Sequence, residues 1–142
     1  MDKEELIYKE AYKFLGTSEI DGPKSNELIT LWILKSASWL DPDDSKTAWC
    51  GCFRGAIGNL TFTGTPPEYY RALSWKNWGK KSDIYSSPKG STVILKRDGG
   101  YHVGLKDKIS KDNIYILGGN QKNKVSIAKY KISDIVDVRI SK

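Results

Sequence analysis

The hydrophobic periodicity of the chain changes once, near residue 91, and this change constrains the fold more than any other feature. Before it, apolar residues recur at spacings of three and four, which is typical of amphipathic helices. From Ser91 onward they alternate with polar residues, which indicates strands. Helices followed by strands favour an α+β fold with N-terminal helices and an antiparallel β-sheet.

Helix signals mark four segments of the first part. The N-terminal caps that we expect are Asp2, Ser25, Thr47 and Thr65, and the third helix runs over 48–60. Gly16 and Gly79 are suited to end the first and fourth helices. A loop is expected around 21–23, between the first two helices.

Strand signals fill the second part. Segments 91–97 and 101–107 flank Asp98-Gly99-Gly100 and predict a hairpin. Further strands are expected over 113–117, 125–132 and 136–140. A chain of 142 residues favours a single domain, and we expect one that spans 1–142.

The chain contains one histidine and two cysteines, and these counts exclude several kinds of site. Zinc sites, two-histidine iron sites and bis-histidine haem need more imidazoles or thiols, so we expect no metal and no cofactor. Cys50 and Cys52 are too close in sequence for normal disulfide geometry and are expected to be free thiols.

No segment predicts a membrane helix or a secretion signal. The longest apolar stretch, 28–40, is interrupted by polar residues and falls short of the ~20 residues that span a bilayer. The N-terminus is acidic and no apolar signal core follows it. We therefore expect cytoplasmic synthesis without a signal peptide and no membrane insertion.

The third predicted helix has a face of glycines without side chains, and it also contains a candidate nucleophile. Gly51, Gly55 and Gly58 recur at helical spacing, so another part of the backbone can approach closely. Cys50 lies in the first turn, where the helix dipole is expected to lower the pKa of its thiol. Such a thiol can attack an amide if a base and an orienting group lie within reach.

His102 is the single imidazole that could act as this base. Alternation directs Val103 to one face and His102 to the other, away from the apolar set. Asn120, after the next predicted strand, is a natural orienting residue for the base. A surface histidine with a buried structural cysteine explains the same pattern, and periodicity does not separate these alternatives.

Five motifs in the same order resemble the CHAP/NlpC-type cysteine peptidases and amidases, particularly a subgroup frequent in phage and prophage genes. They are Trp49-Cys50-Gly51-Cys52-Phe53, Ala72-Leu73-Ser74-Trp75, Trp78-Gly79, Tyr101-His102-Val103-Gly104 and Leu117-Gly118-Gly119-Asn120-Gln121. The match extends over almost the whole chain. Tyr101 stands where the family usually has glycine, and Gly118 where many CHAP domains have glutamate.

The resemblance implies a papain-like α+β fold and a peptidoglycan hydrolase that cleaves an amide bond of the wall peptide. It makes Cys50 the nucleophile, His102 the base and Asn120 the orienting residue, while Cys52 becomes a packing thiol. The activity is either that of an endopeptidase or that of an N-acetylmuramoyl-L-alanine amidase. We expect one catalytic domain without a separate cell-wall-binding domain.

Three residues are expected to bind substrate. Trp49 adjoins Cys50 and is the best candidate for a groove wall, while Trp75 and Gln121 are further candidates. Aromatic residues on helices are more often part of the core, which is the alternative for Trp75. Asp41, Asp43 and Asp44 form an acidic loop that we interpret as solvated, because it lacks the ligand order of an EF-hand.

The net charge of +6 predicts attraction to polyanions. Lysines concentrate in the strand-rich half, at positions 106, 108, 111, 122, 124, 129 and 131. Without a nucleic-acid-binding motif, we expect peptidoglycan and anionic envelope polymers as partners, no nucleic acid, and a monomer. A solvated surface without a partner fits this charge equally well.

The resemblance also suggests a phage endolysin that reaches the wall after holin-type release. A secreted antibacterial amidase effector is the nearest alternative, and a non-catalytic basic binding module is the alternative from another class.

Overall fold

The computed structural model describes residues 2–20 and 25–142, so the loop predicted at 21–23 lies outside the described residues. Its helices are α1 (Lys3–Tyr12), α2 (Glu27–Ser36), α3 (Cys50–Leu60) and the 3-10 helices η1 (Ala72–Asn77) and η2 (Ile132–Asp134). Its strands are β1 (Lys80–Lys81), β2 (Thr92–Arg97), β3 (Gly100–Ser110), β4 (Asn113–Gln121), β5 (Lys124–Lys131) and β6 (Ile135–Ile140). Among the described helices, none is long and apolar enough to cross a membrane.

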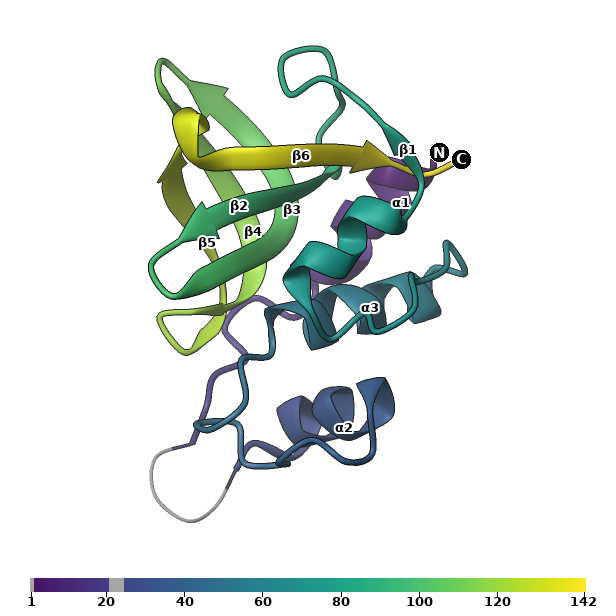
Figure 1. Cartoon of the computed structure of the whole chain (residues 1–142), viewed down its shortest axis with the longest axis vertical. Helices are drawn as coiled ribbons and strands as arrows, with labels where there is room; N and C mark the ends of the chain where they lie inside the picture. The colour runs from purple at the N-terminus through teal and green to yellow at the C-terminus, as the bar shows by residue number, and fades with distance from the viewer. Residues whose placement is uncertain (1, 21–24) are drawn as a thin grey trace.

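The strands form one curved sheet in the order β1-β6-β2-β3-β4-β5, and neighbouring strands are antiparallel. Figure 1 shows this sheet above α2 and α3, with α3 between the sheet and α2 and with α1 beside the sheet. The predicted α+β class and the β2–β3 hairpin are confirmed.

Apolar side chains fill both faces of the sheet. Val103 and Leu105 on β3 join the core that the sheet shares with the helices. Leu95 and Ile116 belong to a second core on the other face, where the sheet curves around its own side chains. A side chain that points away from the helices is therefore still buried at this part of the sheet.

The predicted start of α1 is confirmed, whereas that of α2 is shifted by one residue. Asp2 caps α1 by accepting a hydrogen bond from the Glu5 N–H at 2.8 Å. Asn26 caps α2, because its side chain accepts from the first free N–H groups of that helix. Ser25, the predicted cap, instead accepts a hydrogen bond from the Asp44 N–H at 3.2 Å.

Helix α3 begins at Cys50, two residues later than predicted. Trp49 occupies the cap position and makes no side-chain capping bond. The Thr47 hydroxyl, predicted to cap the helix, donates to the Asp41 carbonyl at 2.7 Å. No side chain at the cap position therefore accepts a hydrogen bond from the first N–H groups of α3, which begin at Cys50.

The fourth predicted α-helix is wrong. Residues 67–70 form turns, and only the short 3-10 helix η1 follows. Glu68 has a left-handed φ of 54°, which interrupts a right-handed helix. Tertiary packing of the next two residues against α3 overrides the local capping signals.

The glycine face of α3 packs against the segment before η1 and not against the sheet. A methyl group added at Gly51 would lie 2.5 Å from the Tyr70 carbonyl oxygen, and one at Gly58 the same distance from the Gly64 carbonyl oxygen. The predicted close approach of backbone is thus confirmed. The sheet instead receives a different face of α3, on which Phe53 joins the shared core.

Candidate active site

Cys50 is the first residue of α3, and its thiol lies beside strand β3. The side chain is 4% exposed. Burial raises the pKa of the Cys50 thiol, while a hydrogen bond with the Val103 backbone and the charge of Arg97 act in the opposite direction. The expectation that the helix start lowers this pKa is wrong, because desolvation outweighs the local dipoles.

His102, the residue before Val103, is fully buried on the other face of β3. Its Nε2 lies 2.9 Å from Gln121 Oε1, and its ring stacks on Tyr130 with the centroids 5.5 Å apart. The pKa of His102 is lowered to about 4, mainly by burial and also by the charge of Arg97, while the hydrogen bond with Gln121 acts in the opposite direction. The imidazole is therefore neutral at neutral pH.

Gln121 determines which nitrogen of His102 carries the proton. Its amide Nε2 donates to the Ile116 carbonyl at 3.1 Å and to the Ser126 carbonyl at 2.6 Å. These two acceptors orient the amide so that Oε1 faces His102, where it also accepts from the Tyr130 hydroxyl at 3.1 Å. An acceptor at this position requires the hydrogen on His102 Nε2 and leaves the lone pair on Nδ1.

His102 Nδ1 is buried and has no hydrogen-bond partner among the described residues, so the thiol of Cys50 does not bond to it. The two groups nevertheless share their surroundings. Arg97 acts on both, and Tyr130, which stacks on His102, is also affected by charge on Cys50. The predicted nucleophile and base thus lie within electrostatic range of the same two side chains, although no hydrogen bond joins them.

The structure does not place Asn120, the predicted orienting residue, on His102. Asn120 has a left-handed φ of 58° and lies in the irregularity of β4 between Gly118 and Gln121. This bulge directs the next side chain, Gln121, toward the imidazole. A methyl group at Gly118 would lie 2.9 Å from Gln121 Oε1, so Gln121 fills the space beside this glycine.

Trp49 and Trp75 do not line an open groove, because both indoles are fully buried. Trp49 Nε1 donates to the Glu19 carboxylate at 2.9 Å. Trp75 lies against Arg54, whose guanidinium carbon is 4.4 Å from the ring centroid. Gln121 is also buried, so none of the three predicted substrate contacts is on the surface.

Arg97 is a residue of the site that the sequence did not reveal. On the hairpin, Leu95 pairs with His102 and Arg97 pairs with Gly100, which makes Arg97 a diagonal neighbour of His102 on the same face. Its side chain also forms a hydrogen bond with Tyr130. The hairpin register could have indicated this proximity once His102 was singled out.

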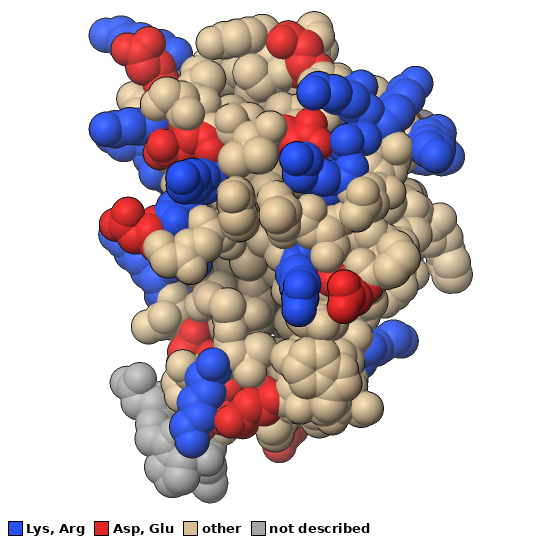
Figure 2. Space-filling model, viewed as in Figure 1, with Lys and Arg blue, Asp and Glu red and all other residues tan. Residues whose placement is uncertain are grey.

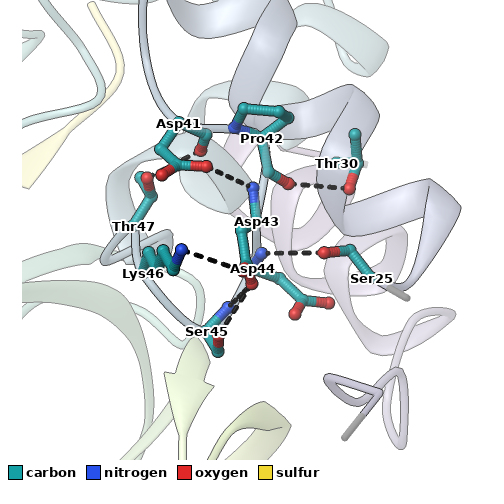
Figure 3. Close-up of polar contacts among 9 residues, drawn as sticks. All are labelled: Ser25, Thr30, Asp41, Pro42, Asp43, Asp44, Ser45, Lys46 and Thr47. Atoms are coloured by element: carbon teal, nitrogen blue, oxygen red, sulfur yellow. Dashed lines mark hydrogen bonds and ion pairs between the residues drawn. The ribbon is translucent and has the colours of Figure 1, made fainter. Parts of the chain in front are cut away.

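The acidic loop is held by hydrogen bonds within its own segment and with α2 (Figure 3). Asp41 accepts from the Asp43 N–H at 3.0 Å, and Asp43 accepts from the Ser45 N–H at 2.9 Å. Asp44 is buried, contrary to the solvated interpretation, and accepts from the Asn26 N–H at 2.8 Å. Within 2–20 and 25–142, no group of three His, Cys, Asp or Glu residues could hold a metal ion.

Basic side chains gather over the sheet-bearing part of the face in Figure 2, with acidic ones among them. Lys106 is an exception to the predicted lysine-rich surface. It is buried, and its Nζ donates to the Ile84 carbonyl at 2.7 Å and to the Ser87 carbonyl at 2.5 Å. This lysine holds the loop before β2 and does not contribute to binding of polyanions.

Three solved structures illustrate the proteins that share this fold. A variant of the resuscitation-promoting-factor-interacting protein RipA has a TM-score of 0.61 and 13% identity, over 98% of this chain and 62% of that one. The peptidoglycan hydrolase RipB from Mycobacterium tuberculosis has a TM-score of 0.61 and 15% identity, over 99% and 65%. The P60 domain of an antigen from M. avium subspecies paratuberculosis has a TM-score of 0.59 and 15% identity, over 99% and 96%.

The chain has the NlpC/P60 fold. The expected papain-like architecture is thereby confirmed, with helices on one side of an antiparallel sheet. The chain spans less than two thirds of RipA and RipB, the first two of these structures. No protein-family model matches the sequence, and no curated protein matches it significantly.

Proposed function

We propose that the protein is a cysteine hydrolase that cleaves an amide bond of peptidoglycan, with Cys50 as nucleophile, His102 as base and Gln121 as the residue that orients the base. One observation carries the proposal. His102 is held through Nε2 by an anchored acceptor while its Nδ1 has no hydrogen-bond partner among the described residues, and the backbone of the next residue, Val103, bonds to the thiol of Cys50 at the start of α3. The likeness to a peptidoglycan hydrolase supports the substrate class.

The resting state in this mechanism contains a neutral thiol and a neutral imidazole. Burial disfavours both charged forms, since it raises the pKa of Cys50 and lowers that of His102. As the substrate carbonyl approaches, the Cys50 Sγ–H proton passes to His102 Nδ1 and the sulfur attacks the carbonyl carbon. The carbonyl electrons move onto oxygen, where the Cys50 backbone N–H is one donor.

Collapse of the tetrahedral intermediate releases the amine. The proton on His102 Nδ1 passes to the leaving nitrogen, the C–N bond breaks, and a thioester remains on Cys50. Water then attacks the thioester with His102 as base, and the acid leaves while Sγ recovers its proton. Gln121 Oε1 accepts from His102 Nε2 throughout, so it stabilises the imidazolium as it forms.

The test measures hydrolysis of purified peptidoglycan by the full chain and by two cysteine variants. Cys50→Ser should abolish the loss of turbidity, while Cys52→Ser should retain it, because Cys52 Sγ faces Ser36 on α2 at 3.2 Å. Thermal melting of each variant confirms that it is folded. Clearance by Cys50→Ser at the parental rate would refute the proposed nucleophile.

Mass spectrometry of the released fragments identifies the bond. An amidase yields glycan strands without peptide and peptides with a new alanine amino end, whereas an endopeptidase leaves peptide on the glycan. Walls of defined chemistry make this assignment direct.

We further propose that the protein acts as a phage-type lysin after release from the cytoplasm. The resemblance of its five motifs to the phage-associated subgroup supports this role. A neighbouring holin gene is the expected genomic context, and an adjacent immunity gene would favour a delivered antibacterial effector instead.

A further inference from the structure

Arg97 places a positive charge at the edge of the candidate active site. It is the last residue of β2, partly exposed, and lies diagonally from His102 on the same face of the hairpin. One of its side-chain contacts is a hydrogen bond with Tyr130, the ring that stacks on His102. A guanidinium has five N–H donors, so this bond leaves donors for a second partner.

Arg97 lines a polar hollow whose other residues include some that are close to Cys50 and Gln121 in sequence. Ala48, which is two residues before Cys50, lines it together with Asn120, which is next to Gln121. Arg97, Lys46 and Lys122 also border this hollow. A substrate whose scissile bond reaches Cys50 therefore passes close to these cations.

The two acidic residues of the hollow each accept a hydrogen bond from within the protein, although Asp44 Oδ1 has no hydrogen-bond partner among the described residues. Glu19 accepts the indole N–H of Trp49 at 2.9 Å. Asp44 is buried, and one of its carboxylate oxygens accepts from the Asn26 N–H at 2.8 Å. Lys46 lies 3.9 Å from Asp43, whereas in the described part of the chain no ion pair joins Arg97 to an acidic residue.

We propose that Arg97 binds a carboxylate of the substrate peptide next to the scissile bond and makes the protein selective for acidic over amidated wall peptides. This inference rests on the proposed function. A guanidinium binds a carboxylate through two parallel hydrogen bonds, and a carboxamide at the same position loses one acceptor and the charge. Arg97 is thus a specificity-determining residue.

The test compares two synthetic wall peptides that differ only in the α-carboxyl of the γ-linked glutamyl residue, which is free in one and amidated in the other. The wild-type protein should cleave the acid with a kcat/KM about 10- to 100-fold higher, mainly through a lower KM. Arg97→Gln should remove this preference, and Arg97→Lys should restore part of it. Lys80→Gln, an exposed substitution on β1, is the control and should retain the preference.

The amidated peptide distinguishes two roles of Arg97. In one, Arg97 binds the carboxylate of the substrate; in the other, its charge only changes the pKa values of Cys50 and His102. If Arg97 acts only through the charge of the site, Arg97→Gln changes cleavage of both peptides by the same factor, and the inference is wrong. Equal cleavage of the two peptides by the wild type overturns it as well. Failure of the wild type to cleave peptide or peptidoglycan contradicts the proposed function itself.

Discussion

His102 makes the stability of the protein depend on pH in a range where few other groups titrate. Its pKa falls from 6.5, the ordinary value for histidine, to about 4 in the folded protein because the ring is buried. Between these values the unfolded chain binds a proton that the folded protein does not. Stability is therefore complete above the ordinary pKa and decreases as the pH falls toward 4.

The size of the effect follows from the two pKa values. At pH 5 the unfolded chain is almost fully protonated at His102, whereas the folded protein is mostly neutral there. Lowering the pH from 7 to 5 should reduce the free energy of unfolding by about 2 kcal/mol. Most carboxylates keep their charge above pH 5, so the contribution of this single histidine is measurable.

Urea unfolding at several pH values from 5 to 8 measures this loss, and NMR titration of the single imidazole gives its pKa directly. His102→Asn should remove most of the pH dependence in this range, even if the variant is less stable at every pH. An imidazole that titrates near 6.5 in the folded protein, or an equal loss of stability in His102→Asn, would refute the reasoning.

Three further predictions concern the site and its support. Cys50 should react slowly with iodoacetamide at pH 7 and faster as the pH rises, because burial raises the pKa of its thiol; mass spectrometry of the labelled peptide measures the rate, and rapid labelling at pH 7 that does not increase with pH would contradict it. Gln121→Leu should lower kcat for wall hydrolysis about 10- to 100-fold, since the buried N–H of His102 loses its acceptor. If both kcat and its dependence on pH are unchanged, Gln121 does not orient His102. Gly51→Ala should destabilise the protein by about 1–3 kcal/mol, as its methyl group would lie 2.5 Å from a backbone oxygen; a melting temperature equal to that of the wild type would disprove the contact.

Much of the secondary structure follows from local patterns. The change of periodicity near residue 91 indicates the α+β class, and Asp98-Gly99-Gly100 indicates the β2–β3 hairpin. The helix expected over 65–79 shows where such patterns are insufficient. Its capping signals are local, but packing of Tyr69 and Tyr70 against the glycines of α3 decides the path of the chain there.

The neighbourhood of His102 depends on contacts between distant segments. Because of a bulge in β4, Gln121 lies beside the ring of His102, where Asn120 was predicted. Alternation along one strand does not predict such a bulge. Arg97 reaches the site through pairing across the hairpin. The residue types of the site were thus recognisable, while their partners were not.

The sequence by itself determined the order of helices and strands, the position of Cys50 at a helix start and the singularity of His102, because these features reside in local spacing and composition. Only the tertiary structure decided that His102 is buried, that Gln121 sets its tautomer and that burial raises the pKa of Cys50. The physical reason is the curvature of the sheet. It closes a second core around the side chains that alternation directs away from the helices, and so removes His102 from water, while Cys50 is buried in the core that the sheet shares with the helices.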